Sequence, residues 1–309
     1  MLEIFLKTLP FFAVISVGYG AGRTGFFTPQ ATAYLTKFVF YFALSAMLFR
    51  FAANLELSAI LDWQFVWAYL AGTIAVYLLA TIVAMARGLR VREAAIEAQC
   101  AVIGNVGFLG IPMLVLLLGA NAIGPVMMVL AVDLIVFSSL VVILITGSRD
   151  GRMSLGILRT VGLGLLANPM VVSISAGLVV SSLALPIPVP VNEFLEILGG
   201  AATPGALFAI GASLAGKSAE RVAVAGWLSL CKLVLHPAAV AVAALLVFDV
   251  DPYAAGVMIT AAALPVAGNV YILAQHYGVA PARVSAAILL STGISILTIS
   301  AVITWVTSL

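Results

Sequence analysis

Long apolar runs alternate with short polar stretches along the whole chain. A helix needs roughly 20 apolar residues to cross the hydrocarbon core of a bilayer. By that measure the pattern predicts ten membrane-spanning helices, at residues 4–22, 31–51, 64–86, 95–118, 123–146, 167–185, 195–215, 222–247, 253–275 and 284–307. Residues 154–165 are too few to span, and they predict a helix at the membrane surface that joins two halves of the chain, ahead of a new helix start at Asn168 and Pro169.

The composition agrees with this pattern. Hydrophobic residues make up 64% of the 309 residues and charged residues only 8%, which is more apolar surface than a soluble core can bury. The chain is therefore predicted to be an all-α integral membrane protein, with the lipid bilayer as a partner. A net charge of +2 without a long basic run gives no sign of nucleic-acid binding. Cys100 and Cys231 lie inside apolar runs, and we expect them to be thiols.

Basic residues are concentrated in every second loop. The loops after the fourth, sixth and eighth spans contain no Lys or Arg, and only Lys7 and Arg50 lie near that side of the membrane. Because Lys and Arg stay on the cytoplasmic side, both termini are predicted to lie on the non-cytoplasmic side of a multi-pass protein in the inner (plasma) membrane. The basic residues of the other loops are Arg23, Arg87, Arg90, Arg92, Arg149, Arg152, Arg159, Lys217, Arg221 and Arg283.

The two halves of the chain resemble each other. "PFFAVISVG" at 10–18 aligns with "PMVVSISAG" at 169–177, and "ALSAMLFRFAANL" at 43–55 aligns with "ATPGALFAIGASL" at 202–214, both at an offset of 159. Five spans in each half would invert the second half in the membrane, which is a transporter architecture. The sequence thus predicts a 5+5 inverted repeat, with residues 1–153 as the first repeat and 154–309 as the second.

Two of the predicted spans are interrupted. "GNVGFLGIP" at 104–112 places Asn105, Gly107 and Pro112 in the fourth span, and "AALPVAGNVYILAQHYG" at 262–278 places Pro265 and Asn269 in the ninth. Proline removes an N–H group and clashes with the preceding turn. Half-helices that start near the two prolines would direct their positive ends at the bilayer centre, which favours an anion. The alternative is a pair of ordinary proline kinks.

The same two motifs resemble those of the auxin efflux carrier family, which includes plant carriers and bacterial carriers of malonate, malate and similar acids. This resemblance implies a fold like that of bile acid symporters and sodium/proton antiporters. In that fold spans 1, 2, 6 and 7 form a scaffold domain, while spans 3–5 and 8–10 form a transport domain in which spans four and nine cross at their breaks. It assigns the crossing to Pro112 and Pro265 and the substrate pocket to Asn105, with Gly107 beside it, and less securely to Asn269. We also expect an elevator-type mechanism and a homodimer through the scaffold helices.

Three ionisable residues, Asp133, Lys232 and His236, lie deep in predicted spans. A charge at mid-bilayer costs several kcal/mol unless it is paired or hydrated. An ion pair of Asp133 with Lys232 or His236 is one prediction, and its role is either coupling of transport to protons or sodium, or a static internal tie. Glu97, near the start of the fourth span, is expected at the membrane interface.

These features favour a secondary transporter of a small organic anion, a mono- or dicarboxylate. An anion channel is the alternative, because broken helices also occur in channels. A membrane-embedded enzyme is a weaker one, since no GxSxG or HExxH motif is found. The sequence also lacks a GxxxxGK[ST] loop for ATP. We expect no cofactor, no metal and no catalytic residue.

Overall fold

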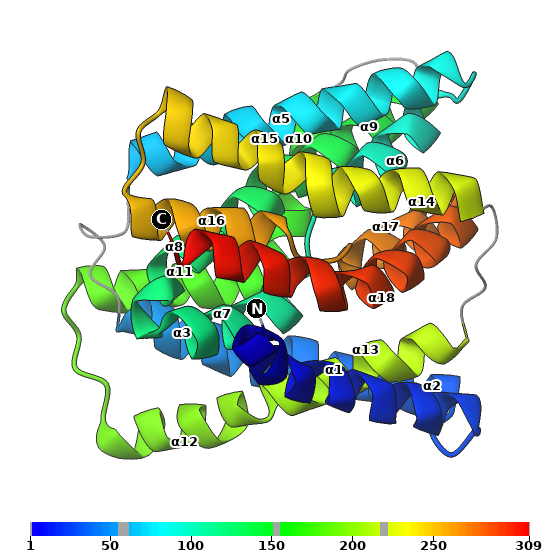
Figure 1. Ribbon diagram of the computed structural model, residues 1–309. Helices are drawn as coiled ribbons and strands as arrows, with labels where there is room; N and C mark the ends of the chain where they lie inside the picture. Colours follow the sequence, from blue (N-terminus) through cyan, green and yellow to red (C-terminus); the bar gives the residue numbers. More distant parts are fainter. Residues whose placement is uncertain (1, 55–61, 151–154, 217–221, 309) are drawn as a thin grey trace.

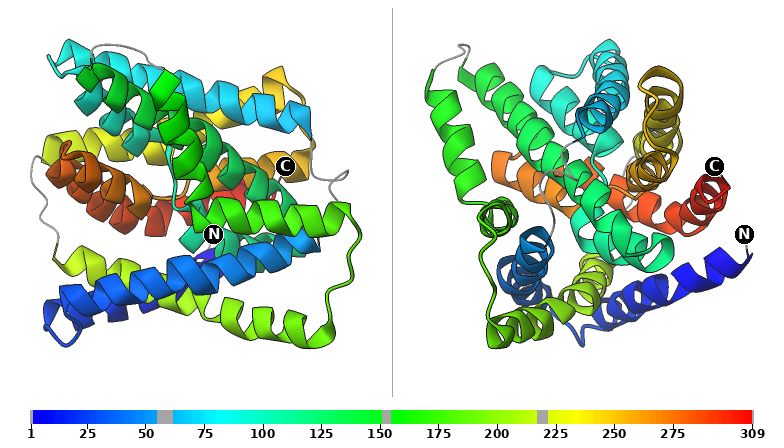
Figure 2. Two further views of the ribbon diagram at one scale, coloured as in Figure 1. Left: turned by 180° about the vertical axis from the view of Figure 1, so that it is seen from behind. Right: turned by 90° about the vertical axis from the view of Figure 1, so that its left-hand side faces the viewer.

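The computed structural model describes residues 2–54, 62–150, 155–216 and 222–308, and helices form nearly all of these ranges (Figures 1 and 2). Short π-helical turns interrupt several of the helices and, with one 3-10 turn (η3), are labelled η. The elements of the first half are α1 (Leu2–Arg23), α2 (Pro29–Phe38), η1 (Val39–Ala43), α3 (Leu44–Ala53), α5 (Trp63–Ala86), α6 (Val91–Val102), η2 (Val106–Gly110), α7 (Ile111–Leu118), η3 (Ala120–Ala122), α8 (Ile123–Val132), η4 (Asp133–Phe137) and α9 (Ser138–Asp150).

The second half continues the same pattern. The predicted surface segment 154–165 is the separate helix α10, and the predicted helix start at Asn168 is confirmed, because the Asn168 side chain accepts a hydrogen bond from the Met170 N–H at 2.9 Å. The elements of this half are α10 (Leu155–Leu166), α11 (Pro169–Ser182), α12 (Val189–Gly200), α13 (Ala202–Ala215), α14 (Val222–Leu230), η5 (Cys231–Leu235), α15 (His236–Val242), η6 (Ala243–Val247), α16 (Pro252–Ala262), α17 (Gly268–Tyr277) and α18 (Pro281–Val306).

Six helical stretches in the described ranges are long and apolar enough to cross a membrane. They are Pro29–Ala53, Trp63–Ala86, Ala120–Ser148, Val189–Ala215, Val222–Val247 and Pro281–Val306, and three shorter apolar helices, Val106–Leu118, Pro169–Ser182 and Pro252–Ala262, accompany them. Two of the shorter helices belong to the predicted fourth and ninth spans, where an interruption divides a longer apolar run. The chain is thus an all-helical protein of membrane type, while the count of ten spans stays a prediction.

The helix ends that lead into the arginine-bearing loops gather at one end of the molecule, on the right in Figure 1. These are the ends of α1, α5, α13 and α17, and Arg87 and Arg283 are joined there through one carboxylate. The loops that follow these four helices therefore lie at the same end of the molecule, as the alternation of basic residues predicted. Arg152, Lys217 and Arg221 lie outside the described residues.

Glycines allow the closest helix contacts on the lower side of the molecule in Figure 1, where α1 and α13 lie. A Cβ atom at Gly18 of α1 would overlap the carbonyl oxygen of Phe208 in α13. A Cβ atom at Gly177 of α11 would lie 2.7 Å from the carbonyl oxygen of Phe49 in α3. Gly177 and Phe208 are numbered 159 higher than Gly18 and Phe49. Each contact therefore joins a glycine of one half to a phenylalanine of the other half, and the two contacts are related by the offset of 159 residues.

The helices fall into two groups around a central layer. In Figure 1, α1, α2, α12 and α13 run along one side, and α5, α14 and α15 run along the opposite side. Between them lie α7, α16, α17 and α18, with the interrupted segments near the centre. The two interruptions are thus enclosed by packed helices.

Candidate functional site

Two helix interruptions meet at the centre of the protein. Residues 103–105 separate α6 from η2 and α7, and residues 263–267 separate α16 from α17. Gly104 and Val266 form an isolated antiparallel bridge. The Asn105 N–H donates to the Pro265 carbonyl at 2.9 Å, and the Ala267 N–H donates to the Ile103 carbonyl at 3.0 Å. Backbone that leaves a helix inside a membrane must be satisfied by other protein groups, and the two interruptions satisfy each other.

The position of the break differs from the prediction in one respect. Pro265 lies in the break of the second segment, as predicted, but the half-helix of the first segment starts at Val106, not near Pro112. Pro112 is in the first turn of α7, directly after η2, where a missing N–H is tolerated. The helix is interrupted at residues 103–105 instead. Glycine suits position 104 because a Cβ atom there would lie 3.2 Å from the Ala261 carbonyl oxygen and 3.2 Å from Lys232 Nζ.

The tripeptide Gly-Asn-Val occurs in both segments, at 104–106 and 268–270, and marks the start of each second half-helix. Asn105 is buried, with 6% of its surface exposed. In Asn269 the side-chain oxygen is buried without a hydrogen-bond partner. Gly268 is exposed, and a Cβ atom there would meet nothing within 4 Å. Both predicted asparagines therefore lie at the crossing, next to the two interruptions.

Gly107 lies against α11 and α3. A Cβ atom at Gly107 would lie 2.6 Å from the terminal methyl of Met170 on α11 and 3.8 Å from Leu44 on α3. The neighbouring Phe108 stacks on Phe40 of η1, with ring centroids 6.4 Å apart. This side of the crossing therefore contacts η1, α3 and α11.

The deeply buried Asp133, Lys232 and His236 lie in one polar network, but the predicted direct ion pair is absent between these described residues. The Tyr69 hydroxyl donates to Asp133 Oδ1 at 2.8 Å. One turn further along α5, Thr73 Oγ1 lies 3.0 Å from His236 Nε2. His236 Nδ1 lies 3.2 Å from Lys232 Nζ. Two residues of α5, Tyr69 and Thr73, therefore link Asp133 with the cationic end of the network.

Lys232 connects this network with the crossing. Its Nζ donates to the carbonyl of Ala262, the last residue of α16. A cation near a helix C-terminus is stabilised by about 0.3–1 kcal/mol when exposed and by up to about 2 kcal/mol when partly buried. An ammonium group has donors and no acceptor. Charged Lys232 therefore makes His236 Nδ1 the acceptor and places the ring hydrogen on Nε2, toward Thr73.

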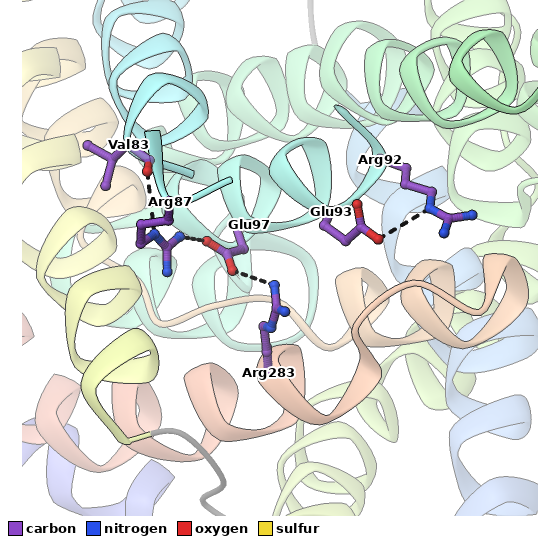
Figure 3. A network of polar contacts seen from close by, with 6 residues as sticks. All are labelled: Val83, Arg87, Arg92, Glu93, Glu97 and Arg283. Atoms are coloured by element: carbon purple, nitrogen blue, oxygen red, sulfur yellow. Dashed lines mark hydrogen bonds and ion pairs between the residues drawn. The ribbon is translucent and has the colours of Figure 1, made fainter. Parts of the chain in front are cut away.

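Glu97 is buried between helices, and its expected depth near the membrane interface stays a prediction. Only 1% of its side chain is exposed. Figure 3 shows its carboxylate between Arg87, at the end of α5, and Arg283, in the first turn of α18, whose Nη1 lies 2.9 Å from Oε1. The sequence gives no signal for this contact, because the three residues lie on three different helices and residue spacing predicts contacts only within one helix. A single carboxylate thus joins both halves of the chain.

Comparison with known proteins identifies the family. Residues 3–303 match the model of the family described as "Membrane transport protein". The chain belongs to this family, that of the auxin efflux carriers. The transporter is 30% identical over 309 residues to a protein of Rhizobium meliloti (strain 1021) named "Putative malonate transporter", a match that covers 97% of this chain and 95% of the relative.

A second relative of the transporter is the "Lysosomal cholesterol signaling protein" of Mus musculus, 28% identical over 228 residues. That match covers 70% of this chain and only 26% of the mouse protein, so most of the mouse protein has no counterpart in the match. The family and the bacterial relative indicate a transporter and not an enzyme.

Proposed function

We propose that this protein is a secondary transporter that binds a small organic anion at the crossing of its two interrupted segments. The main support is the pairing of the two breaks, with Asn105 and Asn269 at the starts of two half-helices whose positive ends meet there. Backbone N–H groups at such ends, together with amide side chains, are suited to a carboxylate. The name of the bacterial relative makes a malonate-like dicarboxylate the first substrate to test.

We further propose that the protein works as an elevator. The moving group would contain α5–α9 and α14–α18, and the static scaffold would contain α1–α3 and α11–α13. The glycine contacts of Gly18 and Gly177, offset by 159 residues, support ten spans arranged as a 5+5 inverted repeat with halves at 1–153 and 154–309. The contact of Gly107 and Phe108 with η1, α3 and α11 is where the groups would slide. A homodimer through the scaffold helices, and an inner-membrane location with both termini on the non-cytoplasmic side, complete the proposal.

Uptake into proteoliposomes tests the substrate and the site together. Purified protein would be assayed with labelled malonate, malate, acetate and indole-3-acetate, with unlabelled acid inside the vesicles. Saturable uptake that is accelerated by the internal acid indicates a carrier, while uptake without counterflow indicates an anion channel. No uptake of any of the four acids would contradict the proposed function.

The site is tested by Asn105→Ala. Loss of an amide contact to a carboxylate should weaken binding by about 1–3 kcal/mol, which is about 5- to 150-fold in the dissociation constant. Asn121→Ala, in the exposed turn η3, is the matched control and should bind normally. If Asn105→Ala binds malonate as tightly as the control does, the site lies elsewhere.

A further inference from the structure

The buried network of Asp133, Tyr69, Thr73, His236 and Lys232 ends beside the proposed anion site, and one of its oxygens has no partner. Asp133 has 3% of its surface exposed and Lys232 none. Asp133 Oδ1 accepts from Tyr69, while Oδ2 is buried without a hydrogen bond. An ionised carboxylate in this setting is stabilised by fewer contacts than it can accept, because it offers about four lone-pair sites. The vacant oxygen is a place where a proton can bind.

The charge of the network depends on what the crossing holds. Lys232 Nζ lies within 3.2 Å of the position that a Cβ atom of Gly104 would occupy, so it lies against the chain next to Asn105. With Asp133 ionised and Lys232 charged, the network is neutral. An anion bound at the crossing adds a negative charge in a medium of low dielectric, where such a charge is costly. A proton on Asp133 Oδ2, taken from water, compensates one unit of that charge.

The other members of the network can adjust to this proton. The hydroxyls of Tyr69 and Thr73 both donate and accept, so they can reorient when Asp133 gains a proton. No other described charged group enters the network. α16 contributes the Ala262 carbonyl, and Glu97 on α6, the next carboxylate, is occupied by Arg87 and Arg283.

We propose that Asp133 takes up a proton when an anion binds at the crossing, so that the protein binds anion and proton together. Tyr69, Thr73 and His236 act as positioning residues that hold Asp133 and Lys232 apart and connect them. This inference rests on the proposed function. It adds the identity of the coupled ion and the residue that holds it.

Titration calorimetry with malonate, or with whichever acid of the four binds most tightly, measures the proton directly. The same titration is run in phosphate and in Tris buffer at several pH values, because the two buffers differ in ionisation enthalpy. The wild type should take up about one proton per anion, and its affinity should fall by up to about tenfold per pH unit as the pH rises. Asp133→Asn should still bind the anion but take up about one proton fewer. Protons that the acid itself gains or loses on binding contribute equally to both proteins, so they cancel when the uptake by Asp133→Asn is subtracted from that by the wild type.

A second pair of variants separates the network from general packing. Thr73→Val breaks the link to His236 and should alter the pH dependence of binding. Thr260→Val removes a buried hydroxyl that donates to the Gly256 carbonyl of its own helix, at 2.7 Å, and should leave the pH dependence unchanged. Equal proton uptake in wild type and Asp133→Asn, with binding intact, would overturn the inference while the proposed function stands. Binding of none of the four acids would overturn both.

Discussion

Neutralising Glu97 should destabilise the protein far more than neutralising an exposed glutamate. Glu97→Gln keeps the size of the side chain and leaves Arg87 and Arg283 facing a neutral amide. A hydrogen bond to a charged group contributes about 1.5–3 kcal/mol, and Glu97 accepts one from each arginine. The side chains of Arg87 and Arg283 are 34% and 17% exposed, so water replaces part of what is lost. We therefore expect a loss of about 2–4 kcal/mol in the free energy of unfolding.

Thermal unfolding of the purified protein in detergent measures this loss. At a few degrees per kcal/mol, Tm should fall by roughly 5–10 °C. The matched control is Glu196→Gln, which removes the charge from a pair with Arg50 at 3.0 Å whose side chains are 61% and 29% exposed. Exposed pairs contribute about 0.2–1 kcal/mol, so the control should lower Tm by no more than roughly 1–3 °C.

A double-mutant cycle shows whether the two charges act on each other. Arg283→Gln combined with Glu97→Gln should cost less than the sum of the single changes, with a coupling energy above about 1 kcal/mol. Transport per folded molecule should be unchanged, because the contact lies away from the crossing. A Glu97→Gln variant as stable as Glu196→Gln, with no coupling to Arg283, would refute the view that this contact holds the two halves together.

Three further predictions follow from the described contacts. Gly211→Ala should destabilise the protein by about 1–3 kcal/mol in thermal unfolding, because a Cβ atom there would overlap the Ile15 carbonyl oxygen in α1; an unchanged Tm would contradict that packing. In intact cells, a cysteine placed at Asn121 should react with an impermeant thiol reagent added outside and one at Arg90 should not, and reversed labelling would invert the topology. Pro265→Ala should lower the rate of malonate uptake more than Tm, because a regular helix there would break the pairing of the two interruptions; normal uptake would remove Pro265 from the site.

The glycine prediction has its own control. Gly216 ends α13, and a Cβ atom there would meet nothing within 4 Å. Gly216→Ala should therefore leave Tm nearly unchanged, which separates loss of helix packing from a general effect of replacing glycine.

The sequence by itself determined the properties that depend on residues close together in the chain. Apolar runs of sufficient length predicted the membrane class, because each helix must satisfy its own backbone in lipid. The glycines and prolines of 104–112 and 262–278 indicated that these two spans are interrupted, since glycine and proline act locally on the backbone. Asn105 and Asn269 were assigned to the crossing from these motifs and from the family resemblance, and both lie there.

Only the tertiary structure decided which distant groups meet. Pro112 and Pro265 carry the same local signal, yet only Pro265 lies in a break, while the first segment is interrupted at residues 103–105 and Pro112 lies in the first turn of α7. Glu97 is buried and paired with Arg87 and Arg283, which come from other helices. Residue spacing within one helix cannot predict a contact between helices. The sequence placed Asp133, Lys232 and His236 deep in their spans, but depth does not specify rotation about the helix axis. That rotation, set by packing, turned Asp133 toward Tyr69 and Lys232 toward Ala262.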